Sequence, residues 1–121
     1  MDKLNFLTAG IPLCAKDYKQ GFETLSNMGL DGLELEFVRG VRISDVSRKS
    51  VLERDKNLVV TAHAPFYVNL NSKEEEKIEA SIQRIVETAL VANSLNAFSI
   101  TYHAAYYMEK DKEEVYKKVV E

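Results

Sequence analysis

The sequence predicts an α/β fold: a single domain over residues 1–121, made of about four parallel (β/α) units, which is half of a TIM barrel. Three observations predict this fold. Short apolar segments alternate with helical patterns in units of roughly 30 residues, as parallel βαβ units require. Three of these segments have one polar and one apolar face, because polar side chains occupy every second position. The two histidines, His63 and His103, each close one such segment.

The first two units occupy residues 4–55. Residues 4–9 are predicted as a strand, because they are mostly apolar and are followed by a glycine and a proline. The next apolar side chains recur at the spacing of one helix face, and Gly29 suits a C-terminal cap. These side chains are Tyr18, Phe22, Leu25 and Met28. Residues 32–38 are predicted as the second strand, and Ser44 is a candidate cap for a short helix that follows.

The third and fourth units contain the clearest helix of the chain. Residues 58–63 are predicted as the third strand, and Ser72 with Glu75 has the spacing of a capping box at a helix start. Six apolar residues then form one predicted stripe: Ile78, Ile82, Ile85, Val86, Ala89 and Leu90. Residues 98–103 are predicted as the fourth strand. A last helix is predicted to start near Asp111.

The two faces of the strands favour a barrel over an open sheet. In the second strand Glu34 and Glu36 share one face, opposite three apolar side chains. Burying unpaired carboxylates against helices would cost several kcal/mol each. A barrel avoids this cost, because its outer face packs on helices while its interior can remain polar or hold metal. A doubly wound sheet would instead have strands that are apolar on both faces.

The two histidines are candidate metal ligands. His63 and His103 lie on the polar faces of the third and fourth strands, and each is followed by an alanine. Active sites of parallel barrels lie at the C-terminal ends of strands. Adjacent strands are about 4.8 Å apart, so the two imidazoles could share one metal ion. In the alternative interpretation, each histidine is a hydrogen-bonded residue beside a loop.

The carboxylate of Glu36 lies at the end of the second strand with the same parity as the histidines. It could be a metal ligand, but two other roles are favoured. One is that of an acceptor for an imidazole N–H, and the other is that of a simple carboxylate in the barrel interior. A catalytic zinc usually has three protein ligands, so the two histidines alone do not define a complete site.

Charge and cysteine content restrict the partners and the compartment. The formal net charge is −3, so contact with DNA would need a local basic patch. Arg39 and Arg42 near the end of the second strand are candidates, although they could be solvated loop charges. The single cysteine, Cys14, allows no intrachain disulfide, which is typical of a reducing cytoplasm. Neither a signal peptide nor a membrane span is expected.

Three segments resemble archaeal proteins of the endonuclease IV type, that is, AP endonuclease family 2 of the xylose-isomerase-like barrels. They are residues 33–40 (LELEFVRG), residues 63–71 (HAPFYVNLN) and residues 102–107 (YHAAYY). The resemblance runs along nearly the whole chain but covers only the N-terminal half of the family's length. Leu7 stands where a glycine would be expected.

The resemblance implies a zinc-dependent hydrolase that cuts DNA at abasic sites. By motif match, His63 and His103 would be two ligands of one zinc ion, or of another divalent metal such as manganese. Phe66, Tyr67, Asn69 and Arg39 would face the DNA. No catalytic residue is assigned, because the family's remaining ligands come from later strands. This chain is therefore expected to hold only part of the site, to bind metal weakly and to hydrolyse little by itself.

Two other functions remain open, together with one mode of assembly. A sugar isomerase or epimerase on the same barrel could use Glu36 for proton transfer. The chain could also be a non-catalytic half-barrel with vestigial histidines. A half-barrel leaves two open sheet edges, so two copies could pair edge to edge and close an eight-stranded ring with twofold symmetry.

Overall fold

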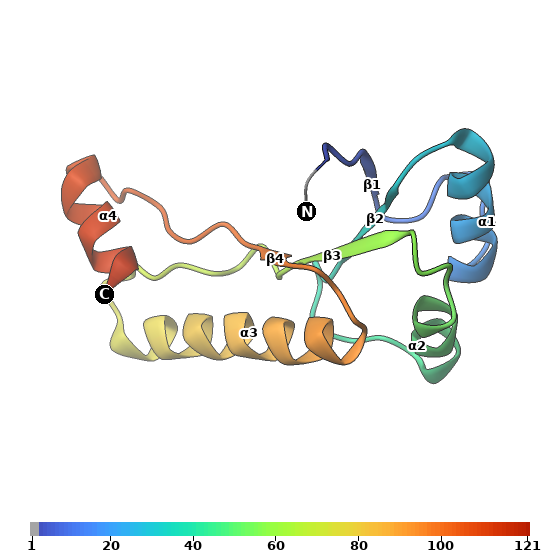
Figure 1. Cartoon of the computed structure of the whole chain (residues 1–121). Helices are drawn as coiled ribbons and strands as arrows, with labels where there is room; N and C mark the ends of the chain where they lie inside the picture. The colour runs from blue at the N-terminus through green and yellow to red at the C-terminus, as the bar shows by residue number, and fades with distance from the viewer. Residues whose placement is uncertain (1–2) are drawn as a thin grey trace.

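The computed structural model describes residues 3–121 and alternates strand and helix from end to end (Figure 1). The elements are β1 (Leu7–Ala9), α1 (Tyr18–Met28), β2 (Gly32–Glu36), α2 (Asp45–Leu52), β3 (Val59–His63), α3 (Glu75–Ser94), β4 (Ile100–Thr101) and α4 (Lys112–Val120). The four strands form one sheet in the order β1-β2-β3-β4, and every neighbouring pair is parallel. The predicted (β/α) architecture is confirmed.

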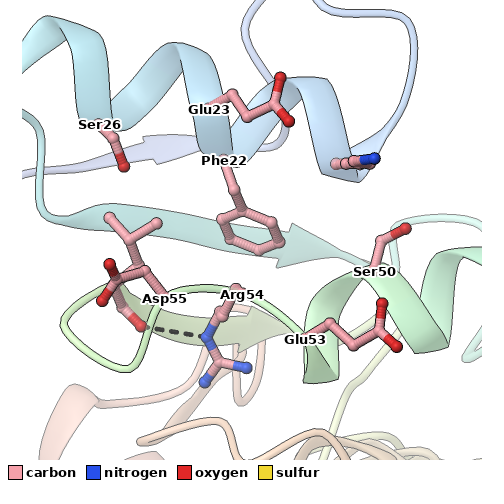
Figure 2. A pocket seen from close by; sticks show the side chains of 9 residues that line it. Phe22, Glu23, Ser26, Ser50, Glu53, Arg54 and Asp55 are labelled. Carbon is pink, nitrogen blue, oxygen red and sulfur yellow. Dashed lines mark hydrogen bonds between the residues drawn. The ribbon is translucent and has the colours of Figure 1, made fainter.

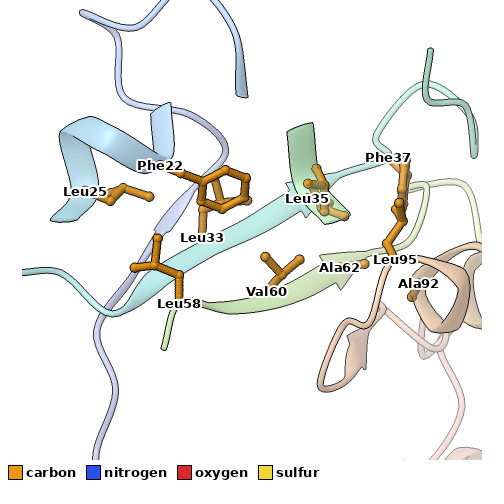
Figure 3. Packing of buried hydrophobic residues seen from close by; sticks show 11 residues of the cluster. Phe22, Leu25, Leu33, Leu35, Phe37, Leu58, Val60, Ala62, Ala92 and Leu95 are labelled. Carbon is orange, nitrogen blue, oxygen red and sulfur yellow. The ribbon is translucent and has the colours of Figure 1, made fainter. Parts of the chain in front are cut away.

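The apolar face of the sheet carries the core. Leu33 and Leu35 of β2, with Val60 and Ala62 of β3, are at most 1% exposed and pack against side chains from the helices (Figure 3). The helices contribute Phe22, Leu25, Val51 and Ala92 to the same cluster. Because side chains alternate along a strand, this packing turns the intervening residues to the opposite face.

The opposite face of the sheet is polar and hollow. A depression of about 370 Å³ lies on it, lined in part by Glu34, Thr61 and Thr101 together with β1. These side chains share a face because Glu34 pairs with Thr61 and Glu36 with His63 in the parallel register. The hollow corresponds to the interior of a barrel, as the alternation of side chains predicts.

The start of β2 needs a glycine because the neighbouring backbone lies so close. Gly32 has φ of 158°, and a Cβ atom built there would lie only 1.7 Å from the carbonyl oxygen of Val59. Close approach of β2 to β3 therefore excludes any side chain at this position.

The strands are shorter than predicted. The expected strands 4–9, 32–38 and 98–103 reduce to three, five and two residues. Hydrogen bonding to the neighbouring strand does extend further, since the Phe98 amide donates to the Val60 carbonyl. β1 and β4 are the edges of the sheet and have a partner on one side only, so their ends are less regular.

Two predictions about α3 are wrong. The helix begins at Glu75 with Glu74 as its N-cap residue, and Ser72 accepts a hydrogen bond from the Glu74 amide, so the expected Ser72–Glu75 capping box does not form. The buried side of the helix is not the expected apolar stripe either. The fully buried residues are Ser81, Thr88 and Ala92; of the expected stripe, Ile78 and Ile85 are half-buried, whereas Ile82, Val86 and Leu90 are 43–65% exposed.

Small side chains explain which face of α3 is buried. Ser81 and Thr88 each donate a hydroxyl hydrogen bond to a carbonyl one turn earlier in the helix, so burial leaves no unpaired hydroxyl. Small residues also allow α3 to lie close against β3 and β4. The larger side chains Ile82, Val86 and Leu90 then remain on the exposed side of α3.

Candidate metal centre

The two histidine rings lie side by side at the C-terminal edge of the sheet. Their centroids are 5.1 Å apart, and the ring planes are inclined by 44°. His63 ends β3 and pairs in register with Thr101, and His103 follows two residues later with the same parity. The structure therefore brings together the two residues that the sequence singles out. Their role as metal ligands stays a prediction.

A hydrogen bond fixes the tautomer of His63. Its Nδ1 atom lies 2.7 Å from the carbonyl oxygen of Ala64. A carbonyl only accepts hydrogen bonds, so Nδ1 must carry the hydrogen. In the neutral ring the lone pair is then on Nε2, the atom that would bind a metal. A backbone acceptor on the other ring nitrogen is the usual arrangement of a metal-binding histidine.

Glu36 stands beside this pair with an altered affinity for protons. Burial, followed by the negative charge of Glu34, raises the pKa of the Glu36 carboxyl, and the nearby His63 partly offsets this increase. Glu34 accepts a hydrogen bond of 3.3 Å from the Thr61 hydroxyl. Two carboxyl groups therefore line the interior next to the histidines, and one of them holds its proton more tightly than usual.

Tyr18 belongs to the same surroundings, although the sequence indicated only a helix position for it. Burial, with a smaller contribution from the Glu36 charge, raises the pKa of the Tyr18 phenol. The phenol therefore stays protonated and able to donate a hydrogen bond. Only the folded chain reveals this relation between the start of α1 and the end of β2.

The donor set fits a metal such as zinc in part. Two neutral imidazoles are good ligands for zinc, and Glu36 is a nearby carboxylate, the type of ligand that manganese prefers. Within residues 3–121, however, no three histidine, cysteine, aspartate or glutamate side chains are grouped closely enough to hold an ion. These residues therefore supply part of a coordination sphere.

The loops that follow the two histidines are joined by asparagine side chains. The Asn69 side-chain oxygen accepts hydrogen bonds from the amides of Asn71 and Tyr106, at 3.1 and 3.2 Å. The buried Asn71 amide group in turn donates to the carbonyls of Tyr106 and Tyr107. Asn69 thus connects the loops after β3 and β4, and its expected contact with DNA stays a prediction.

The aromatic residues of the first loop lie at the surface. Phe66 is 58% and Tyr67 40% exposed, and their rings meet edge to face at 5.2 Å. The guanidinium of Arg84 from α3 lies 4.5 Å from the centroid of the Tyr67 ring. Arg39 is exposed in the loop after β2. These positions leave all of them accessible to a large ligand, and Arg84 is a neighbour that sequence reasoning missed.

A separate cleft lies between α1 and α2, on the helix side of the sheet (Figure 2). It has a volume of about 240 Å³ and is lined by residues such as Phe22 and Arg54. The guanidinium of Arg54 donates hydrogen bonds to four backbone carbonyls, so its donors are already used in holding the chain together. The cleft is on the other side of the sheet from the histidines and takes no part in their site.

Comparison with known proteins identifies the family. A family model described as the xylose isomerase-like TIM barrel matches residues 22–121. The chain belongs to this family. An uncharacterised protein of Methanocaldococcus jannaschii is 40% identical over 116 residues, which are 96% of this chain and 42% of that protein.

Solved structures agree on the xylose isomerase-like barrel fold. Endonuclease IV from Thermus thermophilus matches with a TM-score of 0.66 and 18% identity, over 97% of this chain and 46% of that one. The 3-keto-D-glucoside 4-epimerase of E. coli matches with a TM-score of 0.69 and 16% identity, over 97% and 48%. The chain spans about half the length of these relatives. Within residues 3–121, no helix is long and apolar enough to cross a membrane.

Proposed function

We propose that this chain is part of a metal-dependent phosphodiester hydrolase of the endonuclease IV type that acts on DNA with abasic sites. The observation that carries the proposal is the pair of imidazoles with centroids 5.1 Å apart, with His63 Nδ1 bonded to the Ala64 carbonyl so that Nε2 is the ring atom left to bind a metal. Structures of an endonuclease and of an epimerase share this fold, so the fold alone does not choose between the two activities.

In this proposal the described residues would have separate roles in binding the metal and the DNA. His63 and His103 would hold a zinc or manganese ion as neutral ligands, and neither would serve as the base. The bound metal would lower the pKa of a water molecule and polarise the phosphodiester. Phe66, Tyr67 and Arg39 would contact the DNA from the surface of the loops. Asn69 would keep the two histidine loops together, whether or not it also reaches the DNA.

Calorimetric titration with zinc tests the ligand assignment. We expect weak binding, with a Kd above the micromolar range, because two imidazoles give only part of a zinc site. His63→Ala and His103→Ala should each abolish the heat of binding, whereas Lys49→Ala on the outer helix α2 should leave it unchanged. Unaltered binding in both histidine variants would refute the assignment. Sub-micromolar affinity in the monomer would refute the claim that the site is partial.

A sugar isomerase or epimerase is the second candidate, favoured by the raised pKa of Glu36. A carboxyl group that titrates closer to neutral pH is better suited to proton transfer on a keto-sugar. Nicking of abasic-site DNA without turnover of keto-sugars favours the nuclease, and the reverse result favours the epimerase. The absence of both activities, together with unchanged metal binding in both histidine variants, would leave a non-catalytic half-barrel. We place any of these roles in a reducing cytoplasm, since Cys14 is a free thiol.

We also propose that a second copy of the chain closes the barrel. β1 and β4 each pair on one side only, and near these edges Phe6 and Phe98 are 61% and 63% exposed. Four strands are half of the eight that a closed barrel of this type contains. Light scattering should give the mass of a dimer, and Phe98→Glu at the edge should return it to a monomer. A wild-type chain that remains monomeric as its concentration rises would rule out this assembly.

A further inference from the structure

Three arginines converge on a hollow beside Tyr67. The hollow has a volume of about 270 Å³, and its lining includes Arg39 and Arg42 from the loop after β2 and Arg84 from α3. One acidic side chain, Glu87, also lines it. Three positive charges and one negative charge leave a net charge of +2 around this hollow, in a chain whose formal charge is −3.

These arginines have no acidic partner of their own. Among residues 3–121, the ion pairs within 4.0 Å all involve lysines, so none of the three guanidinium groups is neutralised by a carboxylate. The single carboxylate of Glu87 offsets only part of the repulsion among three like charges, and binding an anion would relieve the rest. Guanidinium groups match phosphate oxygens especially well, because their N–H donors form a planar fork.

Tyr67 and Gly40 give the hollow a defined shape. Arg84 stacks on the Tyr67 ring and donates a hydrogen bond of 3.2 Å to the Tyr67 carbonyl, so most of its five N–H donors remain available. A Cβ atom placed on Gly40 would lie 3.8 Å from the Tyr67 hydroxyl and 4.0 Å from Arg42 Nε. The hydroxyl and the Arg42 guanidinium therefore both border the space above Gly40.

We propose that this hollow binds a phosphate group, with Arg42 and Arg84 as its principal contacts. The phosphate could belong to a polynucleotide backbone or to a sugar phosphate, and both present the same anionic oxygens. Only the polynucleotide source rests on the proposed nuclease function. Under that source, the hollow would hold a backbone phosphate away from the one that is cut, beside the aromatic residues of the loop after β3.

Binding measurements on the metal-free chain test this proposal separately from the metal site. The probes are a fluorescent abasic-site duplex, read by anisotropy, and ribose 5-phosphate with inorganic phosphate, read by calorimetry. We expect Arg42→Gln and Arg84→Gln each to weaken binding of whichever probe the wild-type chain binds by about tenfold, the usual loss for one charge-assisted hydrogen bond. For the duplex, the dependence of log affinity on log salt should also fall by about one charge.

A matched control distinguishes specific binding in the hollow from a general effect of positive charge on affinity. Arg48→Gln removes the same charge from α2, where Arg48 bonds to Ser94 instead of lining the hollow. It should leave affinity within about twofold of wild type. Arg84→Lys keeps the charge but loses the planar stacking, and should recover only part of the affinity.

The outcomes distinguish the two sources. Losses for the duplex support a polynucleotide phosphate, and losses for ribose 5-phosphate without duplex binding support a sugar phosphate and count against the nuclease. Equal losses in Arg48→Gln, or wild-type affinity in both pocket variants, would overturn the proposal. That result would leave the zinc titration of the histidine variants untouched, so the two proposals can fail independently.

Discussion

Replacing Leu35 by alanine should test whether the outer face of the sheet supports the site. Leu35 is fully buried on β2, between Glu34 and Glu36, which point to the interior. The substitution removes three carbon atoms, whose transfer from water is worth about 2.4 kcal/mol at roughly 0.8 kcal/mol per methylene. The register partner is Ala62, too small to fill the space left behind. With the cavity included, we expect a loss of about 3–4 kcal/mol of unfolding free energy.

Leu90→Ala provides the matched control for this prediction. Leu90 lies on α3 with 65% of its surface exposed, so the same chemical change should cost less than about 0.5 kcal/mol. Urea denaturation followed by circular dichroism measures both variants, and the slope of unfolding free energy against urea concentration should be the same for the two. A loss below about 1 kcal/mol for Leu35→Ala, or equal losses for the two variants, would refute the assignment of the core to this face.

Two further predictions concern the edges of the fold and the loops of the site. Hydrogen bonds from the Phe6 amide and from Lys3 hold the pKa of Asp31 below its ordinary value. The ionised Asp31 therefore stabilises the fold at any pH above that ordinary value, and this stabilisation is lost as the pH falls through the lowered pKa. Asp31→Asn should therefore lower the thermal midpoint at neutral pH but not in strong acid, and a pH-independent difference would contradict this. Asn71→Ala should lower the unfolding free energy by about 1–3 kcal/mol, because two loop carbonyls lose a buried donor. Chemical denaturation checks it, and an unchanged midpoint would show that the two histidine loops do not depend on this side chain.

The alternation of side chains along the strands predicts much of the candidate site from the sequence alone. Parity along the strands determined that Glu34, Glu36 and His63 lie on one face, because a pleated strand turns successive residues to opposite sides. The same argument placed His103 with them, although β4 ends two residues earlier. Helix periodicity likewise located α1 and its glycine cap, since Gly29 adopts the left-handed conformation. These features are local, so nearest-neighbour geometry is enough to predict them.

The tertiary structure alone decided which surfaces meet. Periodicity identified an apolar stripe on α3, but the helix packs on the sheet through Ser81, Thr88 and Ala92. Small side chains allow the helix to lie close to the sheet, and the two hydroxyls already donate hydrogen bonds within the helix. The contact of Arg84 with Tyr67 joins residues 17 positions apart, and that of Asn71 with Tyr106 joins residues 35 apart. No local sequence pattern predicts such pairs, since they depend on how the strands and helices pack against one another in the folded chain.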